Sequence, residues 1–330
     1  MILTDDFPPQ RGGVATWTAA IVSGLRAAGD EVEVYARARE GLNEAVGVRG
    51  PSFGRWGGAW LAMRSATRLA RADAVLATTW PAATWVSRFP GLARKLHVVA
   101  HGSDITRPTW SPQSRQRVVG RAAHRWAVSR FLANQMTALG HPCSVLPAPV
   151  DVAPRRSRSV GLKRLVGVGR AVETKGGERF VRLVAALGCS GVWIGEGPCL
   201  SRWRELSTRL GADVTFPGER TPPECRAAMA VADLAVLLPR ACPDGSGQEG
   251  LGLVLLEAAA CATPTLGCRI GGVPEAVGPG LIVREPDDTE AVVERLCAWW
   301  TPDRGVEAQE WLTKTHGTQR AVEMLRAAVC

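Results

Sequence analysis

The sequence lacks several features that would assign it to a special class of protein. No apolar run approaches the roughly 20 residues that a helix needs to cross a bilayer. No cysteine precedes Cys143, and the nine cysteines include neither a Cys-x-x-Cys pair nor a His/Cys cluster with zinc spacing. No segment repeats with a period of about 20–50 residues, and no tract is of low complexity. These absences argue against a membrane-spanning protein, a zinc- or disulfide-stapled domain and a repeat protein.

Length and composition are those of an ordinary globular protein. Of the 330 residues, 46% are hydrophobic and 22% are charged, so two domains can each bury a core. An odd number of cysteines in a long chain favours reduced thiols. The first ten residues, MILTDDFPPQ, turn acidic after three apolar residues and do not resemble a signal peptide. We therefore expect a cytoplasmic protein.

The excess of positive charge is confined to one half of the chain. Residues 1–150 contain 18 Lys+Arg and 9 Asp+Glu, a net charge of +9, whereas residues 151–330 contain 22 of each. Two sets of arginines have the spacing of one helix face: Arg64, Arg68 and Arg71 near Trp60, and Arg117, Arg121 and Arg125 beside Trp126. Such faces suit an anionic membrane surface, and they equally suit solvated faces whose tryptophans belong to the core. No nucleic-acid-binding motif accompanies the charge, so we expect no nucleic acid as a partner.

Short apolar runs alternate with amphipathic stretches, which predicts parallel βα units. In the first half, strands are expected at residues 1–5, 31–36, 74–79, 96–102, 126–129 and 144–149. After a proline- and arginine-rich linker, further strands are expected at residues 163–170, 191–197, 213–218, 234–239, 264–268 and 280–283. The predicted fold class is α/β, with two doubly wound Rossmann-like domains. Ligands of such sheets bind at the carboxyl ends of the strands.

Three loops at these strand ends carry glycine or charge. Gly12 and Gly13 open a helix, where unpaired N–H groups can hold an anion, although a glycine pair also serves as a plain turn. Arg170 and Lys175 can neutralise a diphosphate without a metal, or they can be two solvated surface charges. The loop GEGP holds Glu196 between two glycines and is equally compatible with a tight turn that binds nothing.

The stretch QEGLGLVLLE, residues 248–257, contains two glutamates, and we ask what lies between them. A helix that begins near Gly250 would place Glu249 and Glu257 about 12 Å apart along its axis. The N–H groups of Gly250 to Gly252 would fall between the two carboxylates, where a diphosphate can bind. Carboxylates accept hydrogen bonds from the vicinal hydroxyls of a sugar and of a ribose. The stretch therefore predicts a site for a nucleotide sugar.

Together with FPPQRGG and HGSD, these motifs resemble the retaining family 4 glycosyltransferases of GT-B fold, whose two Rossmann-like domains face each other across a cleft. Within that family the chain looks most like the bacterial GDP-mannose-dependent phosphatidylinositol mannosyltransferases and their relatives. The resemblance covers almost the whole chain, and its Glu-x7-Glu and Arg-x4-Lys elements are specific to the class. It implies an acceptor-binding domain at 1–152 and a donor-binding domain at 160–312. It also implies a last helix, about 314–330, that packs back on the first domain.

The resemblance assigns roles to individual residues. The catalytic ones are His101 beneath the anomeric carbon, Glu249 on the donor sugar, and Arg170 and Lys175 on the leaving diphosphate. Glu257 would hold the ribose hydroxyls. The other donor-binding residues belong to the glycine-rich loops and the helix start: Gly12, Gly13, Glu196, Gly197, Pro217, Gly218, Gly250, Leu251, Gly252 and Leu253, with residues 196–198 and 216–220 enclosing the base.

The implied activity is retaining transfer of a hexosyl unit from GDP-mannose or a UDP-sugar to a hydroxyl of a lipid-linked or cell-surface glycan. No Asp-x-Asp occurs, so we expect neither a metal nor a cofactor, and the nucleotide sugar is a substrate. A small soluble metabolite is an alternative acceptor. A nucleotide-sugar 2-epimerase and a sugar-nucleotide binder without activity are alternative functions. With a lipid-linked acceptor, the enzyme would lie on the inner face of the membrane.

Overall fold

The computed structural model describes residues 1–37, 41–42, 45–48, 67–106, 111–154, 161–241, 248–284 and 286–329. The chain divides into two compact units. The first unit comprises Met1–Pro149 together with Thr318–Cys330, and the second unit comprises Val150–Gly317. Each unit is described by itself.

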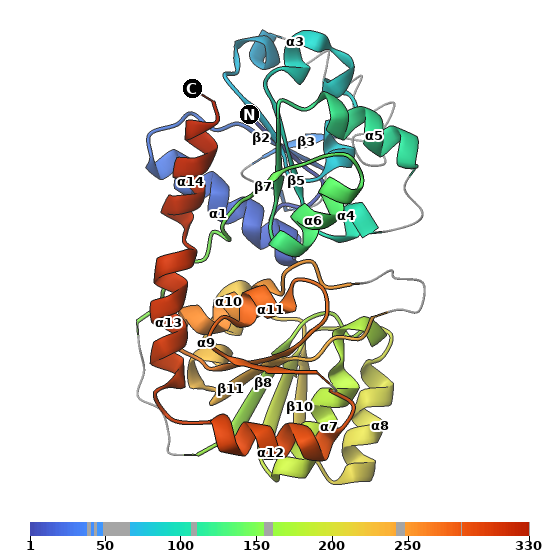
Figure 1. The fold of residues 1–330 in the computed structure, drawn as a ribbon, viewed down its shortest axis with the longest axis vertical. Coiled ribbons are helices and arrows are strands. Elements are labelled where there is room, and N and C mark those ends of the chain that lie inside the picture. The colour runs from blue at the N-terminus through green and yellow to red at the C-terminus, as the bar shows by residue number, and fades with distance from the viewer. Residues whose placement is uncertain are drawn as a thin grey trace. The chain divides into compact units, whose positions relative to one another are not determined.

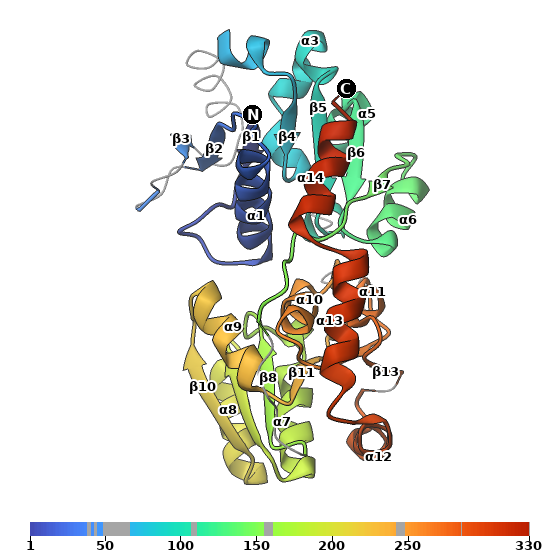
Figure 2. The same cartoon turned by 90° about the vertical axis from the view of Figure 1, so that its left-hand side faces the viewer.

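The first unit, which contains both ends of the chain (Figure 1), is built on a parallel sheet whose strand order is β3-β2-β1-β4-β5-β6-β7 (Figure 2). The strands are β1 Ile2–Thr4, β2 Val34–Arg37, β3 Val46–Val48, β4 Val75–Ala77, β5 Leu96–Ala100, β6 His124–Ala127 and β7 Ser144–Val145. Buried apolar residues fill β1, β4 and β5, as strands covered on both faces require. The order reverses between β1 and β4, so the loops after these two strands flank the point where such sheets bind ligands.

Helices and short 3-10 turns connect these strands. They are α1 Gly13–Ala27, η1 Trp80–Ala83, η2 Val86–Arg88, α3 Pro90–Ala93, α4 Ser103–Thr106, α5 Pro112–Arg121, α6 Arg130–Ala138 and, from the end of the chain, α14 Thr318–Ala327. Figure 2 shows α14 beside α1. The two helices come close because Gly24 of α1 has no side chain, and any Cβ there would collide with Thr318.

The second unit contains a parallel sheet of order β10-β9-β8-β11-β12-β13. Its strands are β8 Arg164–Val168, β9 Ser190–Ile194, β10 Asp213–Gly218, β11 Leu234–Leu237, β12 Thr265–Cys268 and β13 Leu281–Val283. Its helices are η3 Glu173–Lys175, α7 Gly177–Leu187, α8 Leu200–Leu210, α9 Pro222–Val231, α10 Leu253–Ala260, α11 Val273–Val277, α12 Thr289–Trp299 and α13 Arg304–Thr315.

The core of the second unit shows which helices cover which face of its sheet. Leu165 packs in a cluster with Phe180 of α7 and Trp203 of α8, whereas its neighbour Val166 packs with Met229 of α9 and Ala258 of α10. Successive strand residues point to opposite faces. The helices α7 and α8 therefore cover one face, and α9 and α10 cover the other.

The structure confirms the predicted α/β class with two parallel, Rossmann-like sheets, and every predicted strand is present. The short edge strand β3 escaped prediction, because three residues with a central glycine give little periodicity. The first unit ends at Pro149 rather than at the expected residue 152. The last helix begins at Thr318, because α13 already occupies the chain to Thr315.

Candidate active site

In the second unit, the neighbouring strands β8 and β11 lead to helices on opposite faces of the sheet. Their carboxyl ends form the switch point at which ligands of doubly wound sheets bind. The β8 loop carries Arg170 and η3, and then turns into α7 at Gly176, which has a left-handed conformation with φ of 72°. The β11 loop leads to Glu249 and then to α10. Of the predicted donor-binding residues, Arg170, Lys175 and Glu249 therefore belong to the loops at this edge.

Lys175 and Glu249 form an ion pair at this edge, between Nζ and Oε2. The two side chains are 24% and 16% exposed, so each charge is largely withdrawn from water and depends on the other. Arg170 differs, because its side chain is exposed and bonds to none of the residues that the structure describes. The edge thus offers one paired and one unengaged cation from the same loop.

The predicted helix start near Gly250 is wrong. The helix α10 begins at Leu253, after Gly252 in a left-handed conformation with φ of 90° that a right-handed helix cannot include. The preceding segment is held by the loop after β12, where the N–H of Gly272 donates to the Glu249 carbonyl at 2.9 Å. Glu249 therefore precedes the helix. The separation of the two glutamates along a helix axis, calculated from the sequence, does not apply.

The N-terminus of α10 is still open to an anion. No side chain caps it, and no acidic residue occupies its first turn. Its first N–H groups, from Leu253 onward, carry the partial positive charge of the helix end. Leu251 and Gly252, which lead into the turn, are buried, whereas Leu253 is half-buried.

Glu257 lies in the second turn of α10 and is half-buried. Burial raises the pKa of its carboxyl group to about 7, against a smaller opposite effect of the charge on Arg226. None of the described residues donates a hydrogen bond to it. A half-buried carboxyl group without a partner is able to accept the hydroxyls of a ligand.

Glycines hold the loops after β8, β9 and β10 against one another. The N–H of Gly195 donates to the Gly218 carbonyl at 2.9 Å, and that of Ala171 donates to the Glu196 carbonyl at 2.7 Å. A Cβ on Gly197 would lie only 2.5 Å from the Ala171 carbonyl oxygen, and one on Gly218 would lie 2.9 Å from Glu196 Oε1. The Glu196 side chain is exposed beside these backbones. Pro217, at the end of β10, is half-buried.

In the first unit, Gly12 and Gly13 lie at the start of α1. Gly12 is the residue before the helix, with φ of 144°, and Gly13 is its first residue. Both are exposed, and no side chain caps the helix or places an acid in its first turn. The unpaired N–H groups of this turn can therefore receive an anion.

His101 follows β5 on the same edge of the first sheet. Its ring meets the edge of Trp17 with centroids 4.8 Å apart, and its Nε2 is buried without a hydrogen-bond partner among the described residues. Burial lowers the pKa of the imidazole to about 3, so the ring is neutral at neutral pH. A neutral imidazole in this position can accept or donate one hydrogen bond.

Asp104 holds the backbone of this histidine loop, and sequence reasoning missed it. Its Oδ1 accepts the N–H groups of His101 at 3.0 Å and Gly102 at 2.8 Å, while its carbonyl accepts Trp80 Nε1 at 2.7 Å. Burial raises the pKa of its carboxyl group to about 6, although the backbone N–H groups that bond to it act in the opposite direction. The signal was available, because HGSD places a short side-chain acceptor three residues after the histidine, within reach of the backbone N–H groups that precede it.

Other buried polar atoms at this edge were also missed. Gln10 Oε1, Trp17 Nε1, Thr79 Oγ1 and Asp104 Oδ2 have no hydrogen-bond partner among the described residues. They come from the loops after β1 and β4, from α4, which follows β5, and from the second turn of α1. An unmade buried hydrogen bond costs about 1–3 kcal/mol, so these atoms are available to bond to water or to a polar ligand.

Comparison with known proteins shows the family. The family model described as "Glycosyltransferase Family 4" matches residues 11–154, and the one described as "Glycosyl transferases group 1" matches residues 162–301. The GDP-mannose-dependent alpha-(1-6)-phosphatidylinositol monomannoside mannosyltransferase of Mycobacterium tuberculosis (strain CDC 1551 / Oshkosh) is 30% identical, over 95% of this chain and 93% of its own length. The chain belongs to glycosyltransferase family 4.

This glycosyltransferase also resembles more distant proteins. The D-inositol 3-phosphate glycosyltransferase of Actinosynnema mirum is 31% identical over 52% of this chain and 48% of its own. The crystal structure of Anabaena HepE with UDP and glucose superposes with a TM-score of 0.76 at 19% identity, covering 99% of this chain and 98% of that chain. The two Rossmann-like units are thus those of the GT-B fold, and the enzyme transfers a sugar from a nucleotide-sugar donor.

Only part of the predicted basic surface of the glycosyltransferase can be located. Arg64 and Trp60 lie outside the described residues, while Arg68 is exposed and bonds to Glu33 at 2.7 Å. The prediction that Arg125 shares a helix face with Arg117 and Arg121 is wrong. Helix α5 ends at Arg121, because Ala122 is extended, and Arg125 lies in β6.

Arg125, from the second set of arginines, serves the fold of the first unit. Arg125 Nη1 donates to the Val119 carbonyl at 3.3 Å and to the Ala122 carbonyl at 3.1 Å, at the end of α5. The neighbouring Trp126 is buried and donates to His97 Nδ1 at 3.3 Å. This tryptophan therefore belongs to the core, as the alternative interpretation of the sequence has it.

Two further questions from the sequence concern metals and membranes. Within the described ranges, no group of three or more His, Cys, Asp or Glu side chains is arranged to hold a metal ion. Of the helices that the structure describes, none combines the length and the hydropathy needed to cross a bilayer.

Proposed function

We propose that the enzyme is a retaining mannosyltransferase that uses GDP-mannose and acts on a hydroxyl of an inositol-containing, lipid-linked acceptor. The similarity to a GDP-mannose-dependent phosphatidylinositol monomannoside mannosyltransferase over nearly the full length of both chains carries this proposal. That relative makes an alpha linkage. Because the mannosyl unit of GDP-mannose is itself α-linked, the same outcome here requires retention.

The switch-point edge of the second unit supports the binding of the donor. Arg170, Lys175 and the uncapped start of α10 can neutralise the diphosphate without a metal ion. Glu257 can accept the ribose hydroxyls, and Glu249 can accept those of the mannosyl ring when Lys175 turns to the phosphate. The glycine-held loops that contain Glu196 and Pro217 would enclose the base.

The chemical step is the same for any hexosyl donor. The bond from C1 to the phosphate oxygen breaks, and a bond from C1 to the acceptor oxygen forms on the same face. The acceptor proton passes to the departing phosphate, whose negative charge Arg170 and Lys175 stabilise. From the first unit, we assign to neutral His101 a contact with the transferred sugar, and to Gly12 and Gly13 a contact with the phosphate.

The acceptor determines where the enzyme works. A lipid-linked acceptor places it on the inner face of the membrane, to which the net charge of +9 in residues 1–150 is attracted if the lipids are anionic. A soluble inositol phosphate is the second candidate. The 31% identity to D-inositol 3-phosphate glycosyltransferase over about half of this chain favours it.

The test is to incubate the purified enzyme with GDP-mannose or UDP-glucose, in EDTA, together with one acceptor. One acceptor is phosphatidylinositol monomannoside in anionic or neutral vesicles, and the other is soluble D-inositol 3-phosphate. We expect GDP release and an α-mannoside, identified by NMR, with the vesicle acceptor and GDP-mannose, and more product on anionic vesicles. Product only from the soluble acceptor would favour the second candidate. A β-mannoside, or activity that EDTA abolishes, would refute retention or metal independence.

A further inference from the structure

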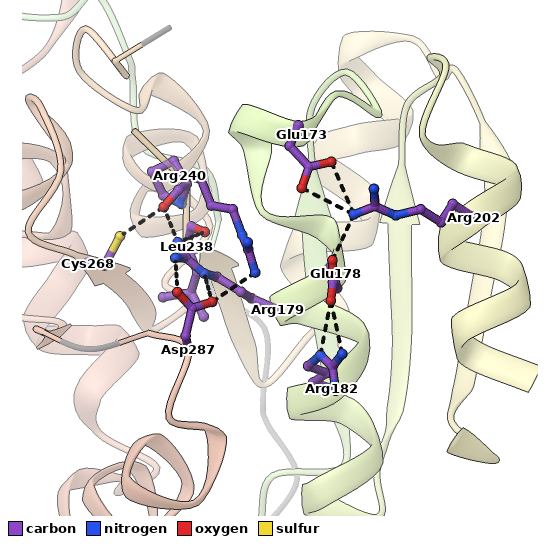
Figure 3. A network of polar contacts seen from close by, with 10 residues as sticks. Glu173, Glu178, Arg179, Arg182, Arg202, Leu238, Arg240, Cys268 and Asp287 are labelled. Atoms are coloured by element: carbon purple, nitrogen blue, oxygen red, sulfur yellow. Dashed lines mark hydrogen bonds and ion pairs between the residues drawn. The ribbon is translucent and has the colours of Figure 1, made fainter. Parts of the chain in front are cut away.

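A buried arginine links three segments behind the donor edge of the second unit (Figure 3). Arg179, in the first turn of α7, is 7% exposed. Its Nε donates to Asp287 Oδ1 at 2.8 Å, and its Nη2 donates to Asp287 Oδ2 at 2.6 Å. Its Nη1 donates to the carbonyls of Leu238, at 3.1 Å, and Pro239. We call Arg179 and Asp287 the clamp.

The two carbonyls that the clamp holds are part of the support for Lys175. They belong to the segment that follows β11. Gly176, which follows Lys175, packs closely on the Leu238 carbonyl, and a Cβ on Gly176 would collide with that carbonyl oxygen. One step further, the N–H of Arg240 donates to the Thr174 carbonyl, just before Lys175, at 3.1 Å. Lys175 is therefore flanked on both sides by contacts with the segment whose position Arg179 sets.

A contribution to stability does not by itself explain why an arginine is buried at position 179. Burying a guanidinium costs solvation, and well-packed apolar residues often replace buried ion pairs without loss. The guanidinium bonds to a planar carboxylate and to two carbonyls at once, which fixes relative positions as a single lysine or an apolar side chain cannot. Arg240 also bonds to Asp287 Oδ1, at 2.9 Å, so the clamp extends into the residue that supports the Lys175 loop (Figure 3).

We propose that Arg179 is a positioning residue for Lys175. Its bonds to the Leu238 and Pro239 carbonyls and to Asp287 fix the position of the chain that leaves β11. Because that chain supports the Lys175 loop, they also fix the position from which the Lys175 ammonium group contacts the diphosphate of the donor. The inference rests on the proposed role of Lys175 in donor binding. Every nitrogen of the Arg179 guanidinium donates to Asp287 or to the Leu238 and Pro239 carbonyls, so its role is to position other groups.

The test compares Arg179→Lys with Arg182→Lys, an exposed arginine one turn further along α7 that pairs with Glu178. Binding of GDP and of UDP is measured by calorimetry, and kcat and KM for the donor are measured well below the melting temperature. We expect Arg179→Lys to weaken nucleotide binding about tenfold and to lower kcat/KM by between about tenfold and a hundredfold. The control should match the wild type. Asp287→Asn, on a carboxylate that is 61% exposed and so tolerant of replacement, should show a smaller loss in the same direction.

A double-mutant cycle separates positioning from general stability. In a Lys175→Met background, Arg179→Lys should have little further effect on nucleotide affinity, because the group that it positions is gone. Folded Arg179→Lys and Asp287→Asn with unchanged affinity and kinetics would overturn the inference, even if they melt at lower temperature. So would full additivity in the cycle. If Arg179→Lys does not fold, Asp287→Asn alone decides. A wild-type enzyme that binds neither nucleotide would instead overturn the proposed function, and the inference with it.

Discussion

Replacing Lys175 by Met separates the two cations of the Arg-x4-Lys loop. In the wild type, Lys175 is paired with Glu249, and both side chains are mostly withdrawn from water. Lys175→Met leaves the Glu249 carboxylate without its partner, which costs about 1–3 kcal/mol of folding free energy. It also removes a charge-assisted contact with the diphosphate, worth about 1.5–3 kcal/mol, or roughly a tenfold to hundredfold loss of donor affinity. Arg170→Met should cause a similar loss of affinity with almost no change in stability, because its exposed side chain bonds to none of the described residues.

The assay combines urea unfolding with nucleotide binding by calorimetry on the wild type, the two single variants and one double variant. The wild type and Arg170→Met should unfold at the same urea concentration, and Lys175→Met should unfold earlier. Adding Glu249→Gln to Lys175→Met should restore part of the stability, because it removes the unpaired charge, but none of the nucleotide affinity. Wild-type affinity in both single variants would refute the placement of the diphosphate at this edge. Equal destabilisation of both would refute the distinction between a paired and an unengaged cation.

Two further predictions concern buried carboxyl groups whose pKa values are raised. Burial raises the pKa of Glu257 to about 7. Between about pH 4.5 and 7 the folded protein therefore keeps a proton that the unfolded chain releases. The free energy of unfolding should fall as the pH rises through this range, by at most on the order of 3 kcal/mol. Urea unfolding at several pH values should show this slope, and Glu257→Gln should flatten it; an unchanged slope would show that another group is responsible. Burial raises the pKa of Asp104 to about 6, so activity should fall as the pH drops through 6, because the hydrogen bonds to the His101 loop lose their charge. Asp104→Asn keeps an acceptor for both N–H groups and should abolish this acid limb in a kcat–pH profile, whereas a persisting limb would assign it elsewhere.

Much of the fold could be read from the chain, because local patterns carry it. Parallel strands buried on both faces are short apolar runs, and their alternation with helices predicts the two sheets and the edge at which a ligand binds. Arg170, Lys175, Gly12 and His101 could be placed at strand ends for that reason alone. The role of each still needed the resemblance to a family.

The wrong predictions concern helix boundaries, at positions where residues with helical spacing can either continue a helix or leave it. QEGLGLVLLE has helical periodicity from Glu249 onward, but Gly252 is left-handed and the loop after β12 holds Glu249 outside the helix. Arg117, Arg121 and Arg125 have helical spacing, but Ala122 turns extended and Arg125 joins a strand. A spacing rule does not specify where a helix ends, because that depends on what the following residues bond to.

The sequence by itself determined the class of fold, which follows from the hydrophobic period of its strands and helices, and the family, which its motifs resemble. Only the tertiary structure decided that Lys175 is paired with Glu249 while Arg170 is not, that Glu257 is buried enough to hold a proton near neutral pH, and that Arg179 clamps Asp287 to the end of β11. The physical reason is that the energy of a charge depends on its solvation and its partners. Those partners lie 74 residues from Lys175 and 108 residues from Arg179 along the chain, and the fold alone brings them together.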